Sequence, residues 1–160
     1  MAPLVANVKG PLQGQSQVCE LVLRALPQWF GIESSTLSYI ESAENLPSFV
    51  AYVADEPVGL LLVKRHFESS AELYLLAVLP AYHRRGVGRA LVDATEQWLR
   101  DEGVEFLQVK TLSPRRVDAN YARTRQFYLG VGFVPLEELP TLWGEHNPCL
   151  LLIKQVRQRK

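Results

Sequence analysis

Residues 73–91 read LYLLAVLPAYHRRGVGRAL, and this stretch decides the fold. An apolar run of strand length ends at Pro80, a short polar loop follows, and Gly86 and Gly88 precede an amphipathic segment. The glycines let the backbone turn closely, and the first free N–H groups of a helix attract an anion. The order of strand, glycine loop and helix therefore predicts a cradle for a phosphate group.

The segment after the glycines has the spacing of a helix. Apolar side chains at intervals of three and four residues share one face: Val87, Ala90, Leu91, Ala94, Trp98 and Leu99. Charged side chains fall mostly on the other face: Asp93, Glu96, Arg100 and Asp101. Gly103 suits the C-terminal stop. Arg84, Arg85 and Arg89 add positive charge at the N-terminal end, which favours phosphate binding over a tight turn without a ligand.

Two other phosphate motifs fit this loop poorly. A P-loop needs a lysine after its last glycine, and none follows here. The dinucleotide fingerprint needs a small residue where this chain has Leu91, and it belongs near the start of an alternating strand and helix pattern.

The loop resembles the acetyl-CoA loop of the GNAT superfamily of N-acetyltransferases, whose pattern is [Q/R]-x-x-G-x-[G/A] after a strand. Here it reads HRRGVG, and His83 replaces the glutamine or arginine. The resemblance implies acetyl-CoA as co-substrate and no metal. It also implies cofactor contacts at Ala77, Val78, His83, Arg84, Arg85, Gly86, Val87, Gly88, Arg89 and Tyr128.

A second landmark, FYLGVGF, covers residues 127–133 and is similar to the late helix and strand of the same superfamily. In that family the tyrosine hydroxyl faces the CoA sulfur, so the resemblance implies that Tyr128 is the general acid that protonates the departing thiolate. The family often has asparagine and alanine seven and four residues before this tyrosine. This chain has Tyr121 and Thr124 there.

Glu72 is the candidate general base. Period two along an extended strand would place Glu72, Tyr74, Leu76 and Val78 on one face. In the histone-acetyltransferase-like branch of the superfamily, a glutamate at the matching position acts as base through water, and a backbone N–H near Val78 would stabilise the thioester oxyanion. Glu72 could instead be a solvated residue at a strand start, and many relatives use no fixed base.

Two groups of residues could border the acceptor. The order of elements places Trp29, Phe30 and Tyr39 around the first two expected helices. It places Trp143, Glu145 and His146 in a late loop. Aromatic rings with an acid would suit a cationic amine, although ordinary core and loop roles are open for each residue. The acceptor could be a small amine, an amino acid, an aminoglycoside-like amine, a protein N-terminus or a lysine.

Composition points to one domain over residues 1–160. The chain is 48% hydrophobic and 21% charged with a formal net charge of zero, so we expect no nucleic-acid or membrane partner. Two cysteines without C-x-x-C spacing indicate no disulfide framework or zinc site, and three scattered histidines support neither a metal site nor a catalytic triad. The start lacks a signal peptide, so we expect a cytoplasmic protein, and the resemblance suggests a homodimer.

The expected fold class is α+β: a mixed sheet flanked by helices, which agrees with the GNAT-like acyl-CoA N-acyltransferase fold that the resemblance implies. Strands are expected over residues 4–8, 49–54, 58–66, 71–79, 106–112, 133–136 and 149–154, with a hairpin turn over 55–57. Helices are expected over 16–26, 34–42, 87–102 and 121–129, the first with Ser16 as its N-cap.

These observations predict an N-acetyltransferase that moves acetyl from acetyl-CoA directly to a primary amine in a ternary complex. A non-catalytic acyl-CoA-binding or sensing domain on the same fold is the first alternative. The second is an interaction module in which the glycine loop binds another nucleotide.

Overall fold

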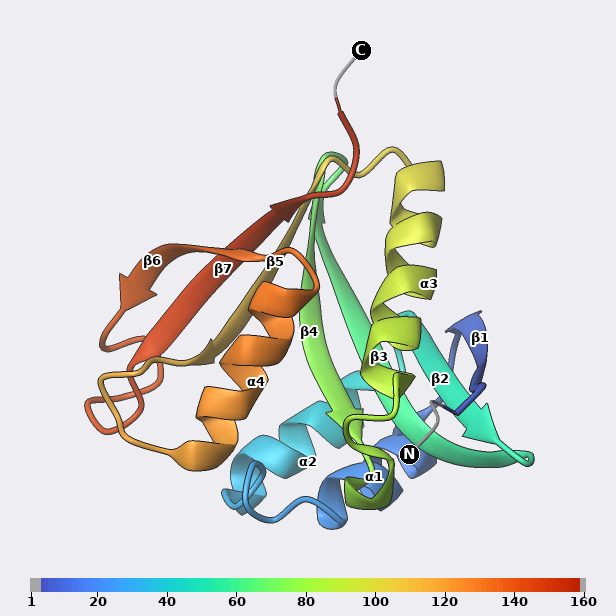
Figure 1. The fold of residues 1–160 in the computed structure, drawn as a ribbon, viewed down its shortest axis with the longest axis horizontal. Helices are drawn as coiled ribbons and strands as arrows, with labels where there is room; N and C mark the ends of the chain where they lie inside the picture. Colours follow the sequence, from blue (N-terminus) through green and yellow to red (C-terminus); the bar gives the residue numbers. More distant parts are fainter. Residues whose placement is uncertain (1–3, 159–160) are drawn as a thin grey trace.

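The computed structural model describes residues 4–158 and contains one mixed sheet of seven strands (Figure 1). The strands are β1 (Asn7–Leu12), β2 (Ser48–Val53), β3 (Glu56–Phe67), β4 (Ser70–Val78), β5 (Phe106–Leu112), β6 (Val134–Leu139) and β7 (Cys149–Gln155). The helices are α1 (Ser16–Arg24), α2 (Glu33–Ser42), α3 (Val87–Asp101) and α4 (Ala119–Gly130), with a short 3₁₀ helix at Pro80–Tyr82. The strand order is β1-β2-β3-β4-β5-β7-β6, and only β4 and β5 run parallel.

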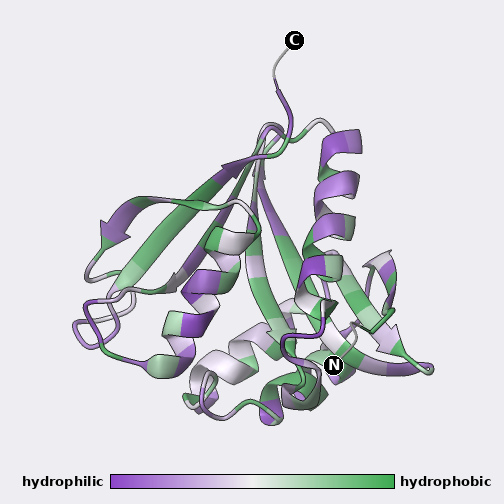
Figure 2. Cartoon of the chain, in the orientation of Figure 1, coloured by the Kyte–Doolittle hydropathy of each residue, from purple (hydrophilic) through white to green (hydrophobic). Residues whose placement is uncertain are grey.

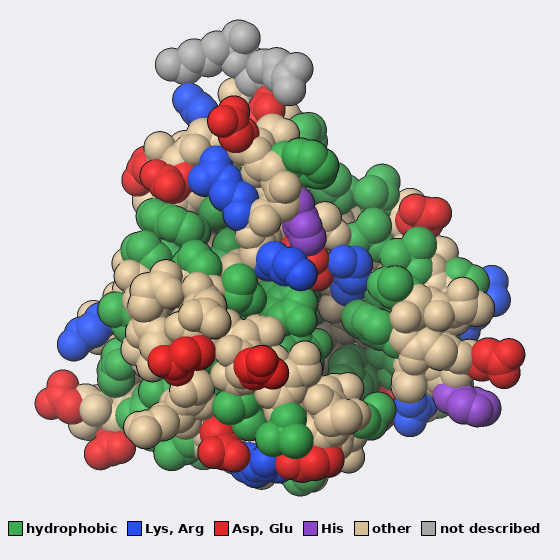
Figure 3. Space-filling view, turned by 180° about the vertical axis from the view of Figure 1, so that it is seen from behind, with side chains coloured by type: hydrophobic (Ala, Val, Ile, Leu, Met, Phe, Trp, Pro, Cys, Tyr) green, Lys and Arg blue, Asp and Glu red, His purple; other side chains and the backbone are tan. Residues whose placement is uncertain are grey.

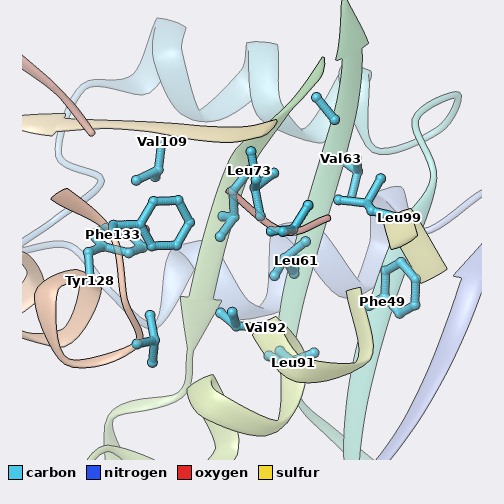
Figure 4. Packing of buried hydrophobic residues seen from close by; sticks show 14 of the residues in the cluster. Phe49, Leu61, Val63, Leu73, Leu91, Val92, Leu99, Val109, Tyr128 and Phe133 are labelled. Carbon is cyan, nitrogen blue, oxygen red and sulfur yellow. The ribbon is translucent and has the colours of Figure 1, made fainter. Parts of the chain in front are cut away.

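The helices cover both faces of the sheet, which confirms the predicted fold class. Side chains from α1 and α2 pack on one face, and side chains from α3 and α4 pack on the other. In β3, Leu60 and Leu62 belong to the first layer, whereas Leu61 and Val63 belong to the second (Figure 4). The strand is therefore apolar on both sides, as expected for a central strand. The outer surface of α3 is hydrophilic (Figure 2).

One extra residue in β4 changes which side chains share a face. Val63 of β3 pairs with Leu73, whereas the preceding residue, Leu62, pairs with Leu75. Tyr74 is therefore the extra residue, and β4 bulges there. Past the bulge the alternation is reversed, and Leu75 packs on the side of α1 and α2. Ala77 packs there as well.

The predicted common face of Glu72, Tyr74, Leu76 and Val78 is therefore wrong. Glu72 lies between two residues that pack toward α3 and α4, so it points to the opposite side, where Tyr74 also packs. Leu76 and Val78 pack toward α3 and α4. The period-two prediction failed because it assumed a strand without a bulge.

The β4 strand also leaves its parallel neighbour. The pairing of β4 with β5 covers only Ser70–Leu73 against Phe106–Val109. Below that point in Figure 1 the two strands diverge, and β5 continues in register with β7. The sheet is thus split over the second half of β4.

The start of α1 corrects a second prediction. The helix begins at Ser16, but its N-cap residue is Gln15, and no side chain caps the helix. The Ser16 hydroxyl instead donates to a carboxylate oxygen of Glu44 at 2.7 Å. Ser16 was expected to be the cap because serine is a good capping residue, but a tertiary partner outcompetes that local role.

The hairpin between β2 and β3 turns one residue earlier than expected. Ala54 and Asp55 form the two-residue turn, and both have positive φ, 50° and 66°. This is the conformation of a type I′ turn, whose twist matches that of paired strands. The first strand, expected over 4–8, is β1 at Asn7–Leu12.

Glu96 was expected on the exposed face of α3, and this prediction is also wrong. Glu96 is 4% exposed, and the Lys154 Nζ atom on β7 donates to both of its carboxylate oxygens at 2.9 Å. The same ammonium donates to the Val131 carbonyl at 2.6 Å. One buried ion pair thus joins α3, β7 and the end of α4. Among residues 4–158, no helix has the length and apolar character needed to cross a bilayer.

We predict that Lys154→Met lowers the free energy of unfolding by about 3 kcal/mol, because the buried Glu96 carboxylate would lose both hydrogen bonds from Lys154 and, among residues 4–158, retain only the more distant Arg100, whose Nη1 atom lies 3.7 Å away. Urea unfolding monitored by circular dichroism measures this change. Arg24→Gln, which removes an exposed pair with Glu33, is the control and should leave the midpoint almost unchanged. Equal midpoints for the two variants would contradict the prediction.

Candidate active site

The divergence of β4 and β5 opens a cleft of about 1120 Å³. Its walls come from the second half of β4, the end of β5, the loop between α1 and α2, the loop after β4, and α4. Figure 3 shows a hollow floored by hydrophobic side chains on the face opposite to that of Figure 1. Basic, acidic and histidine side chains gather at its upper rim.

The edge of β4 that borders the cleft has free backbone groups. The Leu79 N–H donates to the Val58 carbonyl at 2.8 Å, so this residue directs its backbone toward β3. In an antiparallel pair, successive residues direct their N–H and C=O groups to opposite sides. The backbone N–H and C=O groups of Val78 and Leu76 therefore point away from β3, into the gap that β5 leaves open. Such an edge can pair with an extended ligand.

The loop between β4 and α3 presents a second set of free donors. Gly86 is the N-cap residue of α3 with a φ of 86°, and the first helical bond runs from the Ala90 N–H to its carbonyl. The backbone N–H groups of residues 84–89 donate to no other group within residues 4–158. Six free donors at a helix N-terminus are the arrangement that binds phosphate.

Two glycines shape this loop for different reasons. A Cβ atom on Gly88 would lie 3.1 Å from the ring of Phe127, so glycine lets the first turn of α3 approach α4. A Cβ atom on Gly86 would meet nothing within 4 Å, which leaves open space in front of the donors, but the positive φ favours glycine.

The arginines of the loop do not act alike. Arg84 and Arg89 line the cleft, whereas Arg85 does not. The Arg85 guanidinium lies 5.9 Å from the ring centre of Tyr82, and its buried Nε atom has no partner within residues 4–158. Val87 is 1% exposed and belongs to the core, so only its N–H is available to a ligand.

His83, at the position where the family pattern has glutamine or arginine, closes the end of β4. Its Nε2 atom lies 2.6 Å from the Val78 carbonyl oxygen, so a protonated Nε2 donates to that oxygen. Its ring makes an edge-on contact with Trp29 at 5.5 Å between ring centres. His83 lines the cleft together with Ala77, Val78 and Gly88, and their contact with a cofactor stays a prediction.

Trp29 ties the loop between α1 and α2 to α4. Its indole Nε1 atom donates to the Thr124 hydroxyl at 3.2 Å, and the Tyr121 hydroxyl donates to its carbonyl at 2.8 Å. Tyr121 and Thr124 are the two positions where the chain departs from the motif of the last helix. Their side chains hold this loop in place instead.

Tyr128 lies at the base of the cleft, 5% exposed, with its ring packed against Phe127 and Phe133 (Figure 4). Burial, and to a smaller extent the nearby Tyr39 and Tyr121, raise the pKa of its phenol well above the usual value. Its hydroxyl donates to no group within residues 4–158. A neutral hydroxyl without a protein partner in a cleft is suited to donate to a ligand.

Glu72 lies beside the cleft but does not line it. It is 6% exposed. His66 Nε2 lies 2.8 Å from its Oε1 atom, and Lys110 Nζ lies 3.2 Å from both carboxylate oxygens. Lys110 does line the cleft. The alternative of a solvated glutamate at a strand start is therefore wrong, because Glu72 is a buried carboxylate with two partners.

Of the residues that were predicted to border the acceptor, some line the cleft and others do not. Trp29, Phe30, Tyr39 and Trp143 line the cleft, as the order of elements suggested. Glu145 and His146 do not. Within the described part of the chain, no cluster of three or more histidine, cysteine, aspartate and glutamate side chains could hold a metal ion.

Comparison with known proteins agrees with this geometry. The sequence model of the acetyltransferase (GNAT) family matches residues 16–133. The chain belongs to the GNAT family. It is 29% identical over 130 residues to mycothiol acetyltransferase of Beutenbergia cavernae, and the match covers 79% of this chain but only 37% of that longer protein.

Solved GNAT structures share the whole fold at low sequence identity. A GNAT-family acetyltransferase from Desulfovibrio desulfuricans superposes with a TM-score of 0.79 at 19% identity, over 96% of this chain and 100% of that one. An aminoglycoside 6′-N-acetyltransferase complexed with coenzyme A has a TM-score of 0.73 at 18% identity, over 96% and 99% of the two chains. The predicted GNAT-like fold is therefore confirmed.

Several residues of this GNAT cleft were missed from the sequence. Lys110, Arg116 and Tyr74 line it without belonging to either motif. Lys110 stands in an alternating strand, where it reads as an ordinary solvated residue. Only the pairing of β5 with β4 and β7 shows which side of the sheet it occupies.

Proposed function

We propose that this GNAT-family protein transfers acetyl from acetyl-CoA to a primary amine directly in a ternary complex. The observation that carries the proposal is the continuous path of unused donors along one cleft. It begins with the N–H groups of residues 84–89, continues along the β4 edge at Val78 and Leu76, and ends near the Tyr128 hydroxyl.

The two sets of backbone donors fit the two chemical parts of acetyl-CoA. The N–H groups at the start of α3 suit its phosphates, with Arg84 and Arg89 adding positive charge. The free β4 edge suits the amides of the pantetheine arm, which can pair as a short strand. The buried Arg85 Nε atom, which has no hydrogen-bond partner among residues 4–158, lies in the same loop. The residues present therefore fit this substrate.

The reaction joins the amine nitrogen to the thioester carbonyl carbon and then breaks the carbon–sulfur bond. The Val78 N–H is the proposed donor to the carbonyl oxygen as it becomes negative, an interaction worth about 3 kcal/mol in comparable sites. The Tyr128 hydroxyl is the proposed donor to the sulfur as the thiolate leaves. Because the raised pKa keeps this phenol neutral, it remains a donor over the whole working pH range.

The attacking amine must also lose a proton. We place Glu72 at the end of this path, with water between the amine and the buried carboxylate, because Glu72 lies beside the cleft without lining it. His66, 30% exposed and 2.8 Å from Glu72, could pass the proton to solvent. The pair resembles other carboxylate and imidazole pairs that act in proton transfer.

We predict that Gly86→Ala weakens acetyl-CoA binding by roughly tenfold, because a side chain at this φ displaces the N–H donors. Calorimetry with acetyl-CoA, CoA, ADP and NAD measures the effect. Gly144→Ala is the matched control, since Gly144 has a φ of 89° and equally open surroundings in the loop before β7. Equal affinities in the two variants, or equal binding of NAD by the native chain, would refute the assignment of the loop.

We predict that Tyr128→Phe lowers kcat by roughly 100-fold and changes acetyl-CoA affinity little, since only a donor to the departing sulfur is lost. The native kcat should show no alkaline decline below pH 10 from this phenol, because burial raises its pKa. Stopped assays of CoA release from pH 6 to 10 provide both readouts. An unchanged kcat would favour a non-catalytic acyl-CoA-binding domain.

We predict that Glu72→Gln lowers kcat by roughly 100-fold at neutral pH and shifts the acid limb of the pH–rate profile to higher pH, because the amine loses its base and must react from its free form. Glu138→Gln is the control, since that carboxylate is also engaged, by Arg115 and Ser113, but lies outside the cleft lining. If the profile of Glu72→Gln matches that of the native chain, Glu72 is not the base.

A further inference from the structure

Charge along the cleft is strongly one-sided. The ionised side chains that line it are five cations and one carboxylate, namely Arg84, Arg89, Lys110, Arg116, Arg123 and Asp118. Surplus positive charge in a partly enclosed space attracts anions and repels cations. The distribution of these cations along the cleft therefore indicates what each end binds.

Three of the cations belong to the phosphate end. Arg84 and Arg89 flank the free donors at the start of α3. Arg123 lies one helical turn before Phe127, whose ring is the nearest neighbour of Gly88, so it lies on the same side of α4. The negative charges of the acetyl-CoA phosphates would offset the charges of these three side chains.

The other two cations lie at the acceptor end. Lys110 is on β5, and Arg116 is in the loop between β5 and α4. Arg116 donates to the side-chain oxygen of Asn147, a neutral group, and forms no ion pair with a carboxylate of residues 4–158. Arg116 is thus a guanidinium at the rim of the acceptor half without a charged partner.

The nearby carboxylates are already engaged. Asp118 accepts from the first N–H groups of α4 as its N-cap. Glu72 is held by Lys110, and Glu138 is held by Arg115. None of them is free to bind a cationic acceptor.

We propose that the acceptor is a small amine that also carries a carboxylate, in the manner of an α-amino acid, and that Arg116 binds this carboxylate. The inference rests on the proposed acetyl transfer and adds the substrate class. Arginine suits a carboxylate because its planar guanidinium can donate two parallel hydrogen bonds. The edge-on pair of Tyr39 and Tyr74 forms an apolar wall for the side chain of such an acceptor.

The same charges disfavour polycationic acceptors. An aminoglycoside or a polyamine would bring several ammonium groups next to the guanidinium of Arg116, whereas the charge of Lys110 is already paired with that of Glu72. Like charges a few ångströms apart repel each other, which weakens the binding of such acceptors. The structurally similar aminoglycoside acetyltransferase shows the fold alone and carries no expectation for this acceptor.

The test compares acceptors that differ only in the carboxylate. Initial rates are measured with saturating acetyl-CoA for L-leucine and L-phenylalanine, their C-terminal amides, the corresponding decarboxylated amines, the other standard L-amino acids, kanamycin and spermidine. We expect the best free amino acid to exceed its amide by roughly tenfold or more in kcat/KM. The amino group of the amide is less basic than that of the amino acid, so the amide has the larger fraction of reactive free amine at neutral pH. A faster reaction of the amino acid therefore cannot arise from this difference.

Arg116→Gln should raise KM for the best amino acid by roughly tenfold with little change in kcat, and should abolish the preference over the amide. Arg115→Gln is the matched control, because Arg115 is the adjacent arginine, pairs with Glu138 and does not line the cleft. Acetyl-CoA affinity, measured by calorimetry, should be the same in both variants and in the native chain.

The inference is overturned if amides match their amino acids, if kanamycin or spermidine is the better acceptor, if no amino acid is acetylated, or if Arg115→Gln behaves like Arg116→Gln. Acetylation of kanamycin or spermidine alone would leave the proposed acetyl transfer standing. Failure of the native chain to bind acetyl-CoA would overturn the proposed function itself, and the calorimetry separates these two cases.

Discussion

The separation of β4 from β5 is the constraint on which the rest of the molecule depends. A parallel pair that stops at Leu73 leaves the second half of β4 with hydrogen-bonding partners on one side only. In a closed sheet, unpaired backbone groups at this depth would be costly. Here they border a cleft of about 1120 Å³, where a ligand can satisfy them. The cleft thus exists because the pairing of β4 with β5 ends early, and the other elements hold the two parts of the sheet apart.

The helices on the far side of the sheet keep the cleft open and its donors in place. The first turn of α3 can approach Phe127 of α4 because Gly88 has no side chain. The pair of Glu96 and Lys154 then fixes α3 to β7, on the other side of the split. Donors at the start of α3 therefore have a fixed position relative to α4 and Tyr128, and donors that are already in place lower the cost of ordering on binding.

Local patterns predicted the parts of the site that lie within one stretch of chain. The glycine loop, the extent of α3 and the position of Tyr128 are each coded by neighbouring residues. The bulge at Tyr74 is set by the pairing of two strands, so a period-two pattern could not show it. Likewise the buried role of Glu96 depends on a lysine 58 residues away. Composition suggested no overall charge, although the cleft alone is strongly cationic.

Trp29 connects three segments that border the cleft: its own loop between α1 and α2, helix α4 and the loop after β4. Its indole and carbonyl are bonded to α4, and its ring touches His83, which in turn is bonded to the end of β4. A ligand that shifts any of these segments changes the free energy of the other two. Such coupling is reciprocal: if a ligand at one end of the cleft changes the affinity for a ligand at the other end, the second ligand changes the affinity for the first by the same factor. The contacts of one residue thus connect the two ends of the cleft.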